Sequence, residues 1–334
     1  MGSARQGWLV AVGTFLTFLA GAVLTAPGWS PSRAEAAEPT AAFDPHQLDF
    51  TVKFNGESSA YDVLGLYVLP GEALTFEVPG ARSGAFRLTA DEGAVGALGP
   101  GRWRWRAPNH HGLHRIRITR VGGATMTLNA FVLVPARQVR GGMLNGYRIG
   151  EYPKKPFKGQ SIYEPPRGFV EVTEANRDTL VAPHFRLGQF LCKADGGWPK
   201  YLILRERLLL KLELILEEVN KRGFRADGFH VMSGYRTPAY NAAIGNGIYS
   251  RHLWGGAADI FIDVNPADGV MDDLNGDGRI DVEDSGVLKD IVESLHDRPL
   301  YERFIGGLAR YVPTPAHGPF VHVDARGWRA RWGP

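Results

Sequence analysis

Two short segments, far apart in the chain, carry the side chains that most constrain its fold. Segment 250–259 reads SRHLWGGAAD, and segment 320–324 reads FVHVD. Together they supply two imidazoles and one carboxylate, from His252, His322 and Asp259. Three such ligands bind zinc and leave its fourth tetrahedral position open. The fold is therefore expected to bring both segments to one centre of the kind used for hydrolysis.

Each segment has a local reason for its spacing. The small residues GGAA at 255–258 let the backbone pass close to an ion, and a strand is expected to start at Asp259. In the second segment, strand alternation places His322 and Asp324 on the same face. A capped loop and a satisfied core histidine would explain either segment alone. The joint pattern favours a metal site.

These segments resemble the signature of a known enzyme family. The pattern S-x-H-x-x-G-x-A-x-D with a C-terminal V-H is similar to that of the zinc D-alanyl-D-alanine peptidases. This group includes the vancomycin-resistance dipeptidases and carboxypeptidases and the penicillin-insensitive murein endopeptidases. Residues 233–241 (SGYRTPAYN) look like the family's other signature, and the resemblance covers roughly residues 186–334.

The resemblance implies a role for each matching residue. It makes the two histidines and the aspartate named above zinc ligands, and it places Arg236 opposite the substrate carbonyl. It also implies that Ser250 and Tyr235 bind substrate. The implied reaction is hydrolysis of peptidoglycan stem or cross-bridge peptides, commonly between D-amino acids. Removal of a terminal D-alanine and opening of a cross-link both remain open.

The sequence departs from the family at one position. Many members have a glutamate as general base three residues before the last histidine, where this chain has Pro319. His317 and Asp324 are the nearby candidates for the proton relay, and Asp324 could instead orient His322. Hedgehog domains resemble the same fold and keep zinc and calcium, so a non-catalytic, metal-stabilised cell-wall binding protein is an alternative. A cell-wall adhesin with an inert C-terminal domain is another.

A second pattern, at residues 273–284 (DLNGDGRIDVED), predicts a calcium loop. Oxygen side chains stand at positions 1, 3, 5, 9 and 12, glycine at position 6 and isoleucine at position 8, as in EF-hand and dockerin loops. The alternative is an acidic turn solvated by water. The expected ligands are Asp273, Asn275, Asp277, the backbone carbonyl of Arg279, Asp281 and Asp284.

The remaining sequence predicts a multidomain chain. Residues 41–137 alternate apolar and polar residues between Pro-Gly and Gly-Gly breaks, which predicts an N-terminal all-β sandwich, immunoglobulin-like. Residues 138–185 read as an extended connector. Residues 186–334 read as an α+β zinc-peptidase domain with an antiparallel sheet, and an apolar stripe from Leu204 to Val219 predicts its helix. The histidines at 110, 111 and 114 have no carboxylate beside them and are interpreted as loop and strand-start residues.

The N-terminus and the composition predict an exported protein. Residues 1–36 read as a signal peptide with an A-x-A cleavage site, and the apolar run 8–26 is alternatively an inner-membrane anchor. Either places the protein in the periplasm or cell envelope, with peptidoglycan peptides as partners. Cys192 is the single cysteine, which excludes an intrachain disulfide framework. A net charge of +3 without a basic stripe gives no indication of nucleic-acid binding.

Overall fold

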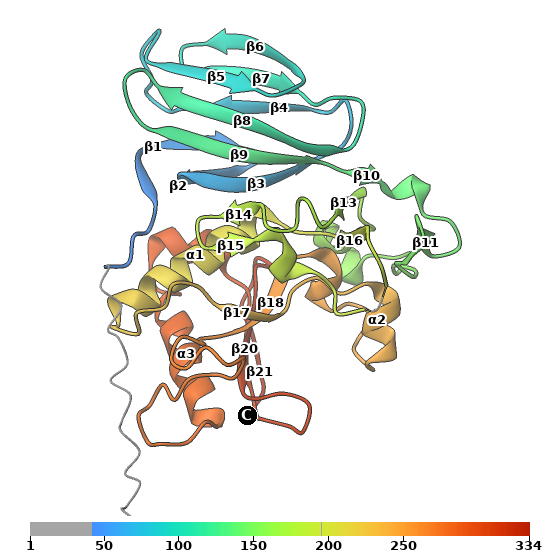
Figure 1. Cartoon of the computed structure of the whole chain (residues 1–334), viewed down its shortest axis with the longest axis vertical. Coiled ribbons are helices and arrows are strands. Elements are labelled where there is room, and N and C mark those ends of the chain that lie inside the picture. The colour runs from blue at the N-terminus through green and yellow to red at the C-terminus, as the bar shows by residue number, and fades with distance from the viewer. Residues whose placement is uncertain (1–41, 195) are drawn as a thin grey trace, which may run out of the picture. The chain divides into compact units, whose positions relative to one another are not determined.

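The computed structural model describes residues 42–194 and 196–334, so the expected export segment 1–36 lies outside the described residues. The described chain belongs to one compact unit of β-sheets, mostly antiparallel, with few helices (Figure 1). The expected α+β character with antiparallel sheets is confirmed. None of the helices in this described part is long and apolar enough to cross a bilayer.

Two β-sheets occupy residues 47–132, and their buried faces contribute to one hydrophobic core. The alternation is clearest in RWRWR, where Trp103 and Trp105 are buried and the arginines are exposed. One sheet has the order β2-β1-β4-β7-β6, from β1 (Gln47–Phe54), β2 (Glu57–Tyr61), β4 (Ala73–Glu77), β6 (Ala94–Gly99) and β7 (Arg102–Arg106). The other has the order β3-β9-β8-β5, from β3 (Val63–Val68), β5 (Phe86–Ala90), β8 (Gly112–Arg120) and β9 (Thr125–Val132).

Residues 134–202, which include the expected connector 138–185, carry short elements. Three strands pair antiparallel in the order β10-β13-β16, and two hairpins accompany them. The strands are β10 (Val134–Pro135), β11 (Met143–Leu144), β12 (Tyr147–Arg148), β13 (Gly168–Val172), β14 (Leu180–Ala182), β15 (Phe185–Arg186) and β16 (Lys200–Leu202). The 3-10 helices are η1 (Ala136–Gln138), η2 (Phe157–Gly159), η3 (Ser161–Tyr163) and η4 (Leu187–Phe190). The domain boundaries at 137 and 185 stay predictions.

A five-stranded sheet forms the C-terminal region, in the order β17-β18-β20-β19-β21. Its pairs are antiparallel except β19 with β21, which are parallel. The strands are β17 (His230–Ser233), β18 (Ala257–Phe261), β19 (Gly307–Tyr311), β20 (Phe320–Asp324) and β21 (Ala330–Trp332). The 3-10 helices η5 (Arg251–Trp254) and η6 (Pro299–Phe304) lie in its connections.

Three α-helices are described, namely α1 (Glu206–Lys221), α2 (Pro238–Ala243) and α3 (Val282–Ser294). The apolar stripe predicted the first, which is confirmed, and it contacts α3 as well as β2, β3 and β14. Helix α2 starts because Pro238 occupies its first turn and the Thr237 hydroxyl accepts a hydrogen bond from Tyr240 N at 3.1 Å. This start fixes the backbone immediately after Arg236.

Candidate metal centre

Three neighbouring elements bring the expected ligands together. His252 lies in η5, Asp259 in β18 and His322 in β20, and Asp259 is the direct cross-strand partner of His322. Gly255 ends η5 in the left-handed region at φ 62°, where a Cβ atom would lie 2.2 Å from the Ile203 carbonyl oxygen. Glycine is therefore required at the turn that returns the chain from His252 to β18.

The three ligand atoms lie at the separations that a small tetrahedral ion requires. Asp259 Oδ1 lies 2.8 Å from His322 Nδ1 and 3.2 Å from His252 Nε2, and the two nitrogens are 3.2 Å apart. Bonds of 2.0 to 2.2 Å to tetrahedral zinc place ligand atoms about 3.3 Å from each other. All three side chains are buried, and this group can hold a metal ion.

Each histidine uses one ring nitrogen for a hydrogen bond away from the centre, which leaves its other nitrogen facing the centre. His252 Nδ1 donates a hydrogen bond to the Gly234 carbonyl oxygen at 2.6 Å, and His322 Nε2 donates to Asp324 Oδ2 at 3.3 Å. A neutral imidazole with one nitrogen protonated presents a lone pair at the other. Three acceptor atoms thus face each other at 2.8 to 3.2 Å, which is stable only around a cation or a proton.

The pKa directions agree with an ionised Asp259 beside two imidazoles that respond differently to burial. Burial raises the pKa of Asp259, but His252 and His322 outweigh it and hold that pKa well below its usual range. Burial lowers the pKa of His252. Burial also lowers the pKa of His322, but its carboxylate neighbours Asp259 and Asp324 outweigh burial and raise it.

Arg236 joins the centre through the second oxygen of the aspartate. Its Nη2 donates to Asp259 Oδ2, and its Nε donates to Ser233 Oγ at 2.8 Å. Both partners lie on the adjacent strands β17 and β18, where Ser233 pairs with Asp259. The guanidinium is thereby held at the edge of the centre, mostly buried.

A cavity of about 670 Å³ opens onto the three ligands. Its walls include Arg236, Ser250 and His317, all expected as site residues. His317 Nδ1 donates to the Gly318 carbonyl oxygen at 2.8 Å, so its Nε2 carries the lone pair when the ring is neutral. Its ring lies edge-on to Phe320, with centroids 5.0 Å apart.

Two expected site residues do not line this cavity. Tyr235 is 1% exposed, and its hydroxyl lies 2.9 Å from that of Tyr152. We therefore assign Tyr235 a packing role in place of substrate binding. Asp324 is fully buried, and its carboxylate accepts hydrogen bonds from Gly307 N and Arg326 in addition to His322. Asp324 therefore lies behind His322, where its carboxylate orients the imidazole.

The expected calcium loop turns around its own acidic side chains. Asp273 accepts hydrogen bonds from Gly276 N and Gly278 N, at 2.7 and 2.8 Å. These backbone amides, that of Gly278 first, lower the pKa of Asp273. Asn275, Asp277 and Asp281 each accept one bond from the amide two residues later, from Asp277 N, Arg279 N and Glu283 N at 2.9 Å.

The last residue of this loop, Asp284, is buried and ties it to α3. It accepts bonds from Leu274 N and Asp281 N at 2.8 Å and forms the helix capping box with Asp281. These carboxylates are not among the close three-ligand groups of the described residues. Calcium binding stays a prediction.

Sequence reasoning missed several groups that build the site. Lys211 lies within the apolar stripe of α1, fully buried, and its Nζ donates to the Asp324 carbonyl oxygen at 2.7 Å. The sequence signal that could have identified Lys211 was a charged residue inside an apolar stripe. Lys193, Tyr240 and Arg326 add polar atoms to the cavity wall. Of these, only Tyr240 lies within a quoted signature.

Comparison with protein-family models and with curated proteins gives no match for this chain.

Proposed function

We propose that this chain is a zinc-dependent peptidase that hydrolyses peptidoglycan stem or cross-bridge peptides at D-amino acids. The observation that carries the proposal is the set of three acceptor atoms, 2.8 to 3.2 Å apart, at the base of a cavity of about 670 Å³. Two imidazoles and one carboxylate are the donor set of hydrolytic zinc sites with an open position. The peptidoglycan substrate rests on the resemblance of the two signatures.

The residues around the centre divide the work of peptide hydrolysis. A zinc ion held by His252, Asp259 and His322 would supply Lewis acidity and activate water. Arg236 would stabilise the negative charge that develops on the carbonyl oxygen, because its guanidinium is already fixed by Asp259 and Ser233. His317 would relay the proton to the leaving amine through Nε2. Ser250, on the cavity wall, would bind the peptide.

Incubation of the purified protein with cross-linked and pentapeptide muropeptides tests this proposal. Mass analysis of the products distinguishes loss of a terminal alanine from opening of a cross-link. Activity is expected to disappear with chelator, to return with zinc, and to be absent in His322→Ala. His230→Ala is the matched control, because His230 lies in the same sheet and pairs with Asp263 away from the cavity. Zinc bound at this centre without any product would support the non-catalytic cell-wall binding protein.

Metal analysis tests the ligand assignment separately. His252→Ala and His322→Ala are each expected to lose the zinc of this centre, because two remaining ligands bind weakly. Retention of that zinc in both variants would refute the assignment. Ser250→Ala is expected to keep zinc and to raise KM, since its side chain lies on the cavity wall rather than among the ligands.

We propose calcium as the ligand of residues 273–284. The backbone amides already hold the side chains at positions 1, 3, 5 and 9 in a curled loop, and Asp284 links that loop to α3. Its role would be structural, because the loop continues directly into α3, which packs on β19 and β20.

We also propose that residues 41–137 form an immunoglobulin-like module and that the protein is exported to the periplasm or cell envelope. The order of the two sheets between residues 47 and 132 supports the module. The apolar run 8–26 and the A-x-A site at 34–36 support export. N-terminal sequencing of native protein is expected to start near Ala37, whereas a start at residue 1 or 2 would support the inner-membrane anchor.

A further inference from the structure

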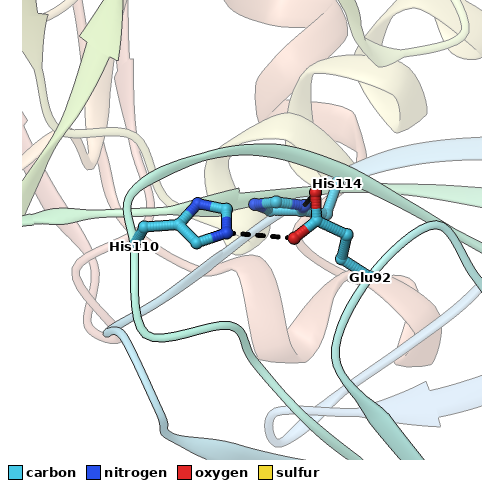
Figure 2. Close-up of side chains that lie close together, drawn as sticks. All are labelled: Glu92, His110 and His114. Atoms are coloured by element: carbon cyan, nitrogen blue, oxygen red, sulfur yellow. Dashed lines mark hydrogen bonds and ion pairs between the residues drawn. The ribbon is translucent and has the colours of Figure 1, made fainter.

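A second group of metal-binding side chains lies in the β-rich N-terminal region, outside the candidate metal centre. Glu92 lies in the turn between β5 and β6, His110 in the loop between β7 and β8, and His114 in β8. Figure 2 shows the three side chains converging from separate segments. Their ligand atoms all lie within 4.8 Å of each other. The expectation that these histidines have no carboxylate partner is therefore wrong.

The surroundings of His110 leave a place for positive charge. Its Nε2 lies 3.0 Å from Glu92 Oε2, while its Nδ1 lies 3.4 Å from the His111 carbonyl oxygen. Both neighbours are acceptors, but a neutral imidazole has only one N–H group. With Nδ1 protonated, the lone pair on Nε2 faces the carboxylate directly. With Nε2 protonated instead, His110 donates to Glu92 but leaves its Nδ1 lone pair against the His111 carbonyl oxygen, whereas an imidazolium or a cation bound at Nε2 satisfies both neighbours.

His114 adds an imidazole without hydrogen bonds. Its side chain is 6% exposed, and its Nε2 is buried with no hydrogen-bond partner. Its Nδ1 lies 3.9 Å from Glu92 Oε1, which is too long for a hydrogen bond. Buried polar groups in folded proteins are satisfied by protein, water or an ion, and leaving one unsatisfied is costly. The ring lies edge-on to His110 at a centroid distance of 5.2 Å, so both imidazoles border the same space.

The main chain that carries Glu92 is held in place. Trp105, fully buried, donates from Nε1 to the Glu92 carbonyl oxygen at 2.8 Å. Gly93 follows at φ 92°, and a Cβ atom there would lie 2.4 Å from the Arg106 carbonyl oxygen. The turn can therefore approach β7 only with glycine at this position. His114 is fixed in the ladder opposite Ala130.

We propose that Glu92, His110 and His114 bind a divalent transition metal ion of the zinc class. Two imidazoles and a carboxylate suit zinc, copper or nickel better than calcium or magnesium, which prefer oxygen ligands. The side chains of His110 and Glu92 are 60% and 53% exposed, so water can complete the coordination. The ion would join the turn 91–93 to the loop 107–111. This site is independent of the proposed peptidase activity.

Zinc stoichiometry of the full chain tests the proposal. In a His252→Ala, His322→Ala background, which removes the candidate metal centre, equilibrium dialysis with metal analysis is expected to count one tightly bound zinc per chain. Adding His110→Ala or Glu92→Gln, both at exposed side chains, is expected to remove it. His111→Ala is the matched control and is expected to retain it, because His111 Nε2 faces Glu171 at 3.3 Å instead.

The same variants in the otherwise unchanged chain provide a second measurement if the background variant does not fold. There, His110→Ala and Glu92→Gln are expected to bind one zinc fewer than the parent and to lose the corresponding zinc-dependent rise in melting temperature. An equal zinc count in the parent, His110→Ala and Glu92→Gln would overturn the proposal. So would a folded background variant without zinc, which would leave Glu92 and His110 as a surface ion pair.

Discussion

His322 Nε2 lies 3.3 Å from Oδ2 of Asp324, two residues further along β20. Strand alternation places both side chains on one face, and Asp324 is fully buried there. Gly307 N donates to Asp324 Oδ1 at 2.9 Å, and a Cβ atom at Gly307 would lie 2.2 Å from Oδ2. The Asp324 carboxylate therefore has room only because residue 307 is glycine. It holds the imidazole with Nδ1 turned toward His252 and Asp259.

Asp324→Asn is expected to weaken zinc binding while leaving all three ligands in place. Carboxylates that orient a ligating histidine typically contribute about 10- to 100-fold to metal affinity. Competition with a chromophoric chelator measures the change. Asp263→Asn is the control, because Asp263 follows β18 and pairs with His230 at 3.3 Å outside the cavity. An unchanged zinc affinity in folded Asp324→Asn would contradict the orienting role.

His317→Ala is expected to keep zinc and to lose peptidase activity by about 10² to 10⁴ in kcat, the usual contribution of a general acid or base. The reason is that His317 lines the cavity without being one of the three ligands. Zinc content and turnover of muropeptides are measured on the same preparation, with His230→Ala as control. Full turnover in a zinc-loaded His317→Ala protein would mean that another residue relays the proton.

Calcium is expected to raise the melting temperature of the protein, since a ligand that binds only the native state stabilises it by mass action. Asp277→Ala is expected to abolish this shift, because position 5 of the loop supplies a ligand. Asp297→Ala, at an exposed acidic residue after α3, is expected to keep it. If calcium has no effect on the parent protein, residues 273–284 are an acidic turn.

The buried Lys211 side chain is expected to make the stability of the protein depend on pH above about 7. Burial lowers its pKa to about 7, although the Asp324 carboxylate opposes this, while Arg331 and Arg326 favour it. Because a depressed lysine pKa means that the unfolded state binds more protons from about pH 7 to 10.5, stability rises with pH across this window. The full slope for one group is about 1.4 kcal/mol per pH unit.

Denaturant unfolding of the parent and Lys211→Met between pH 7 and 10 measures this effect. The parent is expected to gain stability relative to Lys211→Met by on the order of 1 kcal/mol per pH unit. Lys221→Met is the matched control on the same helix, because the Lys221 side chain is 63% exposed. A parallel pH dependence of all three proteins would show that Lys211 keeps an ordinary pKa.

The sequence by itself determined the features that depend on local periodicity. Alternation in FVHVD placed His322 and Asp324 on one face of a strand, and the leucine stripe predicted α1. The spacing of His252 and Asp259 around two glycines predicted a turn into a strand, which the structure contains. Such patterns are visible because neighbouring residues on a helix or strand have fixed relative directions.

Only the tertiary structure decided which distant groups meet. It placed Glu92 beside His110, and it gave Lys211 a hydrogen bond to the strand that carries His322. It also buried Tyr235 against another tyrosine, away from the cavity that its position in the signature suggested. These contacts join separate turns, helices and sheets, and no sequence period encodes them. They follow from how loop lengths and side-chain volumes let the elements pack.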